Sequence, residues 1–259
     1  MRYVSGLRWR ILALMLVGTI IIYVDRNVLG VLAPILKTEL KFSTEQYSYV
    51  VSAFQIVYSF SQPVAGYLTD LIGPRIGYAV AALVWGAACA LHAVSTGWAS
   101  MAGFRGLLGL SEAVAMPTGT KTSTVWFPSS ERSIATGWFN SGSSVGAAIT
   151  PPIVVWISAA YGWQAAFVMT GCLAIVFSAL WFSLYRDPQN HPRLSPQEFA
   201  LIEEGRTAVP TVKPKLSKIF EQKSFIGLII ARFLTEPAWQ TFAFWIPLYM
   251  VSVRGMDIK

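Results

Sequence analysis

The sequence has 259 residues, of which 54% are hydrophobic and 13% are charged, with a net charge of +7 and a mean hydropathy of +0.51. A soluble domain carries roughly a quarter charged residues, so this composition excludes an ordinary soluble protein and indicates that lipid is the solvent. The positive charge does not indicate nucleic-acid binding, because the basic residues lie between apolar runs and not in one patch interleaved with aromatic residues.

The first segment has a basic start and a long apolar run with no small-residue cleavage site after it, so we interpret it as a retained first span. A bilayer core requires about 20 apolar residues per helix. The chain has seven such runs, predicted as spans near 11–36, 47–69, 76–97, 101–125, 133–158, 163–185 and 225–251.

These runs divide the chain into three parts. Residues 1–185 are predicted to form a six-helix transmembrane bundle, and residues 225–259 to hold the first helix of a second bundle. Between them, residues 186–224 are polar, and five prolines discourage a long helix there. Cys89 and Cys172 both lie within apolar runs, which gives no support for a disulfide framework or a metal site.

The distribution of Lys and Arg predicts the orientation. With a cytoplasmic N-terminus, the loops that hold Arg75 and Arg132 and the long polar segment all lie inside, while the opposite face keeps only Lys37 and Lys41 before the last span. We therefore predict a multi-pass protein with its N-terminus in the cytoplasm.

Charged residues inside the predicted spans are the most informative. A charge at a helix centre costs about 2.5–3.5 kcal/mol on insertion scales, so such groups face a cavity or one another. Asp25 and Arg26 lie in the middle of the first span and point about 100° apart, so one can line a cavity while the other meets a neighbouring helix. Arg105 and Glu112 lie about 10 Å apart on one face of the fourth span, so their partners must come from elsewhere, Asp25 and Arg26 being the candidates. We expect these charges to share a water-accessible hollow.

Two other patterns point inward. Gln55, Tyr58, Ser59 and Gln62 recur at helical spacing in the second span, and in lipid such a polar face must point to the protein interior. In the fifth span we interpret the glycines at 142 and 146 as a helix-packing contact.

The second span ends in the sequence Gly66-Tyr-Leu-Thr-Asp70-Leu-Ile-Gly73-Pro-Arg75. Gly66 is expected to let a neighbouring helix approach, Gly73 to permit a sharp turn, and Asp70 to pair with a cation. Arg132, after the fourth span, is a candidate partner of Asp70 and a candidate topology anchor, and the two roles are compatible.

These motifs resemble the major facilitator superfamily. The segment Gly66–Arg75 resembles its signature between helices 2 and 3, while Tyr-x-Asp-Arg-Asn at 23–27, the pattern from Arg105 to Pro117 and Trp-Phe-Pro-x-x-Glu-Arg at 126–132 are similar to its anion:cation symporter group. Further segments at 131–135, 142–146, 151–156 and 232–239 are similar to bacterial hexuronate transporters.

The resemblance implies an all-α polytopic membrane protein, with the six-helix N-terminal bundle of the major facilitator fold plus a seventh transmembrane helix. It implies a location in the bacterial inner membrane. We also expect that the C-terminal bundle of a complete transporter is missing from this chain.

The resemblance also implies roles for individual residues. Arg26 would contact a substrate carboxylate, with Tyr23, Tyr58, Asn27, Gln55 and Ser143 beside it, although a larger polar residue often stands at the place of Ser143. Asp25 and Glu112, with Arg105, would couple transport to protons, and Gly66, Asp70, Gly73, Arg75 and Arg132 would form the gate. The alternative is that the charges form a structural network with no role in binding.

The function implied is proton-coupled symport of a hexuronate such as glucuronate or galacturonate. The alternatives are a carrier of another organic anion, such as an aldonate or glucarate, and a non-transporting membrane sensor. An enzyme is not expected, since there is no phosphate-binding G-x-x-x-x-G-K-[ST] sequence and no H-E-x-x-H zinc motif. We expect a sugar acid and the bilayer as partners, no nucleic acid, no metal, and no cofactor besides the coupling proton.

Overall fold

The computed structural model describes residues 3, 6–204 and 221–256, in which every regular element is a helix. The elements are α1 (Leu7–Glu39), α2 (Thr44–Ile72), α3 (Pro74–Leu91), η1 (His92–Val94), α4 (Trp98–Glu112), α5 (Ala115–Trp126), α6 (Arg132–Tyr161), α7 (Trp163–Leu184), η2 (Pro188–Asn190), α8 (Pro196–Glu203) and α10 (Lys223–Ser252).

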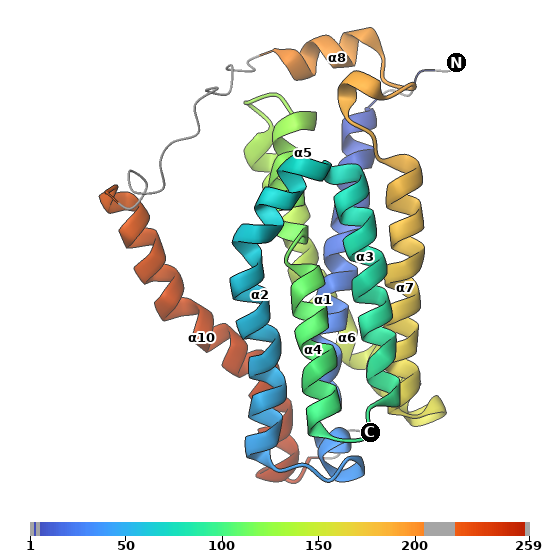
Figure 1. The fold of residues 1–259 in the computed structure, drawn as a ribbon, viewed down its shortest axis with the longest axis vertical. Helices are drawn as coiled ribbons and strands as arrows, with labels where there is room; N and C mark the ends of the chain where they lie inside the picture. Colours follow the sequence, from blue (N-terminus) through green and yellow to red (C-terminus); the bar gives the residue numbers. More distant parts are fainter. Residues whose placement is uncertain (1–2, 4–5, 205–220, 257–259) are drawn as a thin grey trace.

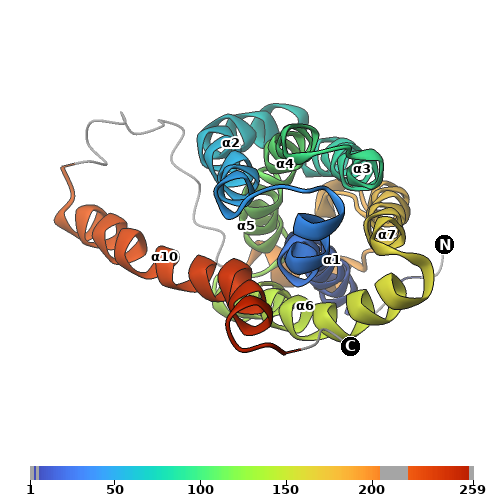
Figure 2. The ribbon, with the colours of Figure 1, turned by 90° about the horizontal axis from the view of Figure 1, so that it is seen from below.

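The long helices run side by side, with α1 at the centre of the bundle (Figures 1 and 2). The most extensive contacts join α1 with α6, α3 with α7, and α2 with α4. Glycines permit two of these approaches, as predicted for Gly142 and Gly146: a Cβ on Gly146 would lie 2.8 Å from the Ile20 carbonyl oxygen of α1. At the α3–α7 contact, a Cβ on Gly171 would lie 2.5 Å from the Gly86 carbonyl oxygen.

Helix α10 lies outside this bundle. It meets α1 and the start of α2 at the end of the molecule opposite α8, and diverges from the bundle toward the other end (Figure 1). At the contact, the Tyr47 hydroxyl donates to the Phe244 carbonyl oxygen at 3.2 Å, and the Tyr47 ring packs edge-on against Trp245 at 5.5 Å.

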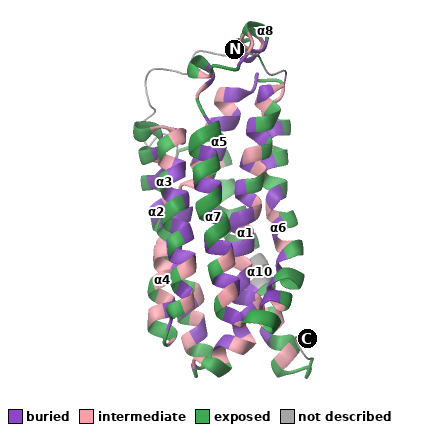
Figure 3. Ribbon diagram, turned by 90° about the vertical axis from the view of Figure 1, so that its right-hand side faces the viewer, coloured by how far each residue is buried: buried purple, intermediate pink, exposed green. Residues whose placement is uncertain are grey.

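The outer faces of the bundle are apolar and exposed, whereas the buried positions line the helix contacts (Figure 3). Four helical segments of the described chain are long and apolar enough to cross a bilayer: α1, Pro74–Val94, α6 and α7. The second and seventh predicted spans correspond to long helices that are not among these four, α2 with 29 residues and α10 with 30.

The fourth predicted span, 101–125, is wrong as a single helix. The chain forms α4 and α5 with a break at Ala113 and Val114. Pro117 explains the break, because its ring nitrogen cannot donate to the carbonyl of Ala113 and its ring clashes with that carbonyl.

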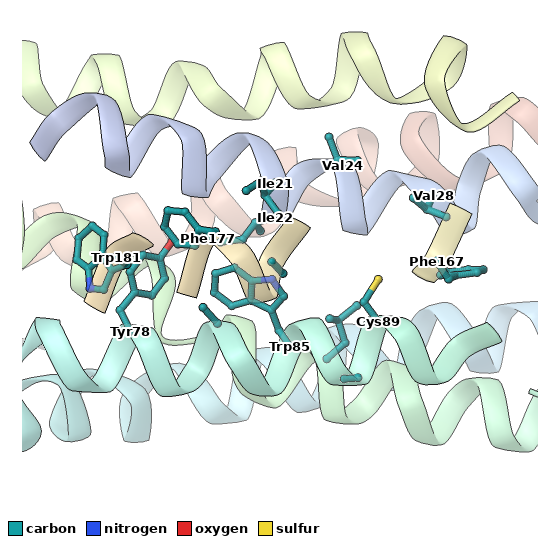
Figure 4. Packing of buried hydrophobic residues seen from close by; sticks show 14 of the residues in the cluster. Ile21, Ile22, Val24, Val28, Tyr78, Trp85, Cys89, Phe167, Phe177 and Trp181 are labelled. Carbon is teal, nitrogen blue, oxygen red and sulfur yellow. The ribbon is translucent and has the colours of Figure 1, made fainter. Parts of the chain in front are cut away.

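The contact between α3 and α7 is filled by aromatic rings (Figure 4). Tyr78 lies between Phe177 and Trp181, with ring centroids 5.6 and 4.8 Å away, and meets both edge-on. The Trp181 indole N–H donates to the Pro74 carbonyl oxygen at 3.0 Å, so a polar atom that would be costly in lipid is satisfied.

The polar segment after α7 folds onto the same end of the bundle as the N-terminus. Ser195 caps α8, accepting from the Glu198 N–H at 3.2 Å, and Pro196 takes the first helical position. The Glu198 carboxylate then accepts from the backbone N–H groups of Leu7 and Arg8, each at 3.1 Å, and from the Arg8 guanidinium at 3.1 Å. This carboxylate therefore fastens α8 to the start of α1. Residues 205–220 of the predicted linker lie outside the described residues.

Candidate functional site: a buried charged cluster

Arg26 is the centre of the site. Its Nε donates to Glu112 Oε2 of α4 at 2.6 Å, and 18% of its side chain is exposed whereas Glu112 is fully buried. Three aromatic rings surround the guanidinium: Tyr23 one turn earlier in α1, and Phe54 and Tyr58 of α2, with centroids 5.2, 5.1 and 4.6 Å from Cζ. Ring faces stabilise a cation where water is scarce, so the charge of Arg26 is balanced by one carboxylate and a partial aromatic cage.

Arg105, in the middle of α4, reaches the same place. Its Nη2 donates to the Arg26 carbonyl oxygen at 3.4 Å, and its Cζ lies 5.9 Å from the Phe54 ring. As the spacing predicted, Arg105 and Glu112 both find their partners on α1. Each keeps a buried polar atom without a hydrogen-bond partner, Arg105 Nε and Glu112 Oε1. A buried polar atom of this kind is costly, and both side chains keep the capacity for one more hydrogen bond.

A close approach of two helices positions the aromatic rings. The backbone of α2 passes Gly109 of α4 so closely that a Cβ on this glycine would lie 2.6 Å from the Phe54 carbonyl oxygen and 3.2 Å from the Tyr58 amide nitrogen. Phe54 and Tyr58 are the two α2 residues whose rings contact Arg26. Only glycine permits this separation, so Gly109 belongs to the architecture of the site although sequence reasoning missed it.

Asp25 lies on the other side of α1. It is fully buried between α3 and α7, where the Cys89 thiol donates to its Oδ1 at 3.6 Å and lies 3.0 Å from the Thr170 hydroxyl. Its Oδ2 has no hydrogen-bond partner. The expected single hollow shared by Asp25, Arg26 and Glu112 is therefore wrong for this structure. The physical reason is the turn of about 100° between successive helical residues, which directs Asp25 to a different neighbouring pair.

The remaining predicted binding residues differ in their surroundings. Tyr23 and Tyr58 contact Arg26 directly. The Asn27 side-chain amide donates to the Tyr23 carbonyl oxygen at 2.6 Å, so part of its hydrogen-bonding capacity is used within α1. Gln55 is half-buried on α2, and the Ser143 hydroxyl donates to the Asn140 carbonyl oxygen of α6 at 2.7 Å. Neither Gln55 nor Ser143 forms a hydrogen bond with Arg26 in the part of the chain that the structure describes.

The predicted gate lies near the end of the bundle that carries α8. Gly73 ends α2 with φ +85°, a conformation that glycine favours, so the predicted sharp turn is present. Gly66 does not have its predicted task, because a Cβ there would meet no atom within 4 Å. It lines a hollow of about 600 Å³ between α2 and α5 instead.

The charged residues of the gate all have partners at this end of the bundle, and Lys121 is a cation of the kind expected beside Asp70. Asp70 is bound by Lys121 of α5 at 3.1 Å, and Lys121 also donates to the Thr69 carbonyl oxygen at 3.0 Å. Arg132, the candidate partner of Asp70, donates to the Phe127 carbonyl oxygen at 3.2 Å, which suits a residue that fixes the start of α6. The Arg75 guanidinium donates to the carbonyl of Phe182 in α7 at 3.0 Å and lies over its ring.

Among solved structures, the chain is similar to a bacterial homologue of the human lysosomal transporter Spinster, with a TM-score of 0.77, 17% identity, and coverage of 98% of this chain and 58% of the other. Among curated proteins, it is 42% identical to the hexuronate transporter of Escherichia coli K12, over 100% of this chain and 61% of that protein. It is 40% identical to the galacturonate transporter of Dickeya chrysanthemi, over 99% of this chain and 75% of that protein.

A third relative, the D-galactonate transporter of Escherichia coli O6:H1, is 30% identical over 96% of this chain and 60% of its own length. The chain thus spans about 61% of the length of the hexuronate transporter that it matches. The sequence model of the Major Facilitator Superfamily matches residues 15–259. With the helical bundle and the buried charged cluster described above, this match shows that the chain is a membrane protein that belongs to the Major Facilitator Superfamily.

Proposed function

We propose that the protein carries a hexuronate such as galacturonate or glucuronate into the cell together with protons, and that Arg26 binds the substrate carboxylate. The observation that carries the proposal is an arginine in the middle of a membrane-spanning helix whose side chain remains 18% exposed. Groups of this kind mark substrate pathways in membrane proteins. The names of the relatives that are 42% and 40% identical support a sugar acid as the cargo.

The geometry of Arg26 suits a second carboxylate. Glu112 accepts from Nε, so the two terminal Nη groups can still offer a planar fork to a substrate. The hydroxyls of Tyr23 and Tyr58, whose rings flank the guanidinium, can donate to the hydroxyl-rich remainder of a sugar acid. Gln55 and Asn27 border the same stretch of α1 and α2 and remain candidate ligands.

Proton coupling follows from charge balance. Arg26 with Glu112 forms a buried pair of opposite charges, and a second carboxylate on Arg26 adds one negative charge to a site that excludes most water. A proton on Glu112 restores the balance. Asp25, buried on the other side of α1, is the second carboxyl that we assign to proton binding; the Cys89 thiol donates to it, and Thr170 lies beside that thiol.

We also assign the protein to the bacterial inner membrane with its N-terminus in the cytoplasm. At the end of the bundle that carries α8, α3 and α6 begin and α7 ends (Figure 1). Arg75, Arg132 and Arg186 lie at these helix ends, and Arg193 lies between α7 and α8. An excess of Lys and Arg in short loops marks the cytoplasmic side.

The test of the binding assignment is uptake of radiolabelled galacturonate by bacterial cells that lack hexuronate transporters of their own. Replacement Arg26→Lys keeps the charge and removes the fork, and we expect uptake at low substrate concentration to fall about 10- to 100-fold, the value of one or two charge-assisted hydrogen bonds. Arg254→Lys is the matched control, since Arg254 also lies over a tyrosine ring, that of Tyr249, but far from the cluster. Unchanged uptake by Arg26→Lys would falsify the assignment.

Two further measurements separate substrate from coupling. A protonophore should abolish accumulation by the wild-type protein, and Glu112→Gln should remove the increase of uptake at lower external pH. Accumulation that resists the protonophore overturns the coupling and leaves the cargo in place. Competition by unlabelled galactonate or glucarate that is stronger than competition by glucuronate would instead identify another organic anion as the cargo.

A further inference from the structure

A second polar cavity lies far from Arg26, at the end of the bundle that carries α8. It has a volume of about 320 Å³ and lies between the start of α1, the end of α7 and the segment that follows α7. Of the described residues that line it, three are arginines and none is acidic: Arg10 of α1, and Arg186 and Arg193 after α7. The proposed transport mechanism uses none of them.

These three arginines are not neutralised by the protein itself. Within residues 6–204 and 221–256, the ion pairs are Arg8 with Glu131 and Glu198, Arg26 with Glu112, Lys121 with Asp70, and Arg232 with Glu236. Arg10, Arg186 and Arg193 are exposed and take part in none of these. Three guanidinium groups around one cavity repel one another, and a bound anion relieves that repulsion.

The segment that carries Arg193 is held in position. The backbone N–H of Arg193 donates to His191 Nδ1 at 3.2 Å, and the His191 ring meets Trp126 edge-on at 5.6 Å. Burial lowers the pKa of His191, which favours the neutral ring, and a neutral ring can accept this bond at Nδ1. The cavity is therefore preorganised by contacts that do not involve the guanidinium groups of its arginines.

The remaining lining residues identify the kind of anion. Leu7, Ile11 and Leu184 contribute apolar side chains to the same cavity. Leu184 is the last residue of α7. It is 48% exposed, and Phe182 of the same helix is 47% exposed. In a membrane protein this is the level where the hydrocarbon meets the headgroups, so the cavity presents cations to the headgroup layer and apolar side chains to the acyl chains.

We propose that this cavity binds the phosphate of an anionic phospholipid, such as phosphatidylglycerol. Arg10, Arg186 and Arg193 contact the phosphodiester, and Leu7, Ile11 and Leu184 contact the first part of the acyl chains. Guanidinium groups suit phosphate oxygens because they donate in pairs within one plane.

The test is native mass spectrometry of the purified chain with phosphatidylglycerol or with phosphatidylcholine of the same acyl chains. We expect phosphatidylglycerol to be retained about 10-fold more tightly or better, and each Arg→Gln replacement in the cavity to weaken its binding about fivefold. The matched control is the triple variant K37Q/K41Q/R254Q, which removes three positive charges at the opposite end of the bundle and should leave the preference unchanged. The R10Q/R186Q/R193Q variant should bind both lipids alike.

Equal retention of the two lipids by the wild-type chain, or an equal loss of preference in both triple variants, overturns the proposal. Glycerophosphoglycerol, which is the headgroup without acyl chains, and inorganic phosphate serve as competitors. If either displaces the lipid at equal concentration, the cavity is a site for a soluble phosphate and the assignment to lipid is wrong. If R10Q/R186Q/R193Q loses its helical circular dichroism, the single variant R193Q, on the segment outside the helices, provides the comparison.

Discussion

Gly109 should be the position where a single methyl group disturbs the site most. Replacing Gly109 by Ala places a Cβ 2.6 Å from the Phe54 carbonyl oxygen and 3.2 Å from the Tyr58 amide nitrogen. Real Cβ contacts essentially never fall below 3.0 Å, and both neighbours are backbone atoms that cannot rotate away. The axes of α2 and α4 must therefore separate, and the rings of Phe54 and Tyr58 move with α2.

The same helix supplies a control of the same chemistry. At Gly106, one turn earlier, an added Cβ would meet only Val57 Cγ2 at an ordinary 3.6 Å. Both Gly→Ala changes gain the same helix propensity, about 1 kcal/mol. The difference between the two variants is then the cost of overpacking, which we expect to be about 1–3 kcal/mol in the free energy of unfolding.

Unfolding of the purified chain in mixed detergent micelles gives the two unfolding free energies, and galacturonate uptake reports the position of the rings. We expect Gly109→Ala to be less stable than Gly106→Ala and to transport less at low substrate concentration, because Tyr58 is displaced from Arg26. Equal stability and equal uptake of the two variants would refute the reasoning that the glycine sets the helix separation.

Three other changes test features of the end that carries α8. Gly73→Ala forces a side chain into φ +85° and should cost about 1–2 kcal/mol in the free energy of unfolding, measured by detergent-induced unfolding, and no loss would show that the turn relaxes easily. Lys121→Gln removes the cation that binds Asp70. Because the two side chains are 29% and 56% exposed, we expect the free energy of unfolding to change by about 0.5 kcal/mol or less. A loss above about 2 kcal/mol would show that the pair contributes more than a surface ion pair does. Glu198→Gln removes the negative charge at the start of α1 and should weaken the docking of α8 by about 1–2 kcal/mol. Amide hydrogen exchange within Pro196–Glu203 should then accelerate about tenfold, whereas unchanged exchange would show that other contacts hold α8.

The sequence predicted the helical class and most helices within a few residues, because lipid requires long apolar runs and each run leaves a clear signal. The predicted helix that proved wrong contains a proline whose effect on the helix was not taken into account. Pro117 lies inside the fourth predicted span and could have indicated the break at Ala113, had its missing N–H been considered. The prolines of residues 186–224 were expected to discourage a long helix, and α8 is short, with Pro196 as its first residue after the capping Ser195.

The candidate site was predicted as a set of residues but not as an arrangement. The pairing of Arg26 with Glu112 could be expected, since two buried charges of opposite sign on neighbouring helices have few other choices. Helical geometry required Asp25 and Arg26 to diverge, yet which helices each would meet depends on packing that one sequence does not reveal. The same holds for Lys121, an ionisable residue within the fourth predicted span that we did not connect with Asp70.

The separation of Asp25 from Arg26 has a mechanical consequence for α1. One peptide bond joins the two residues, yet their side chains contact different helices. Arg26 meets α2 and α4, whereas Asp25 lies between α3 and α7. Glycines of α6 hold α1 so closely that it has little freedom to move sideways in that direction. Any translation or rotation of α1 that shifts the backbone of one residue also shifts the other. Movement at the Arg26–Glu112 pair is therefore mechanically coupled to movement at Asp25.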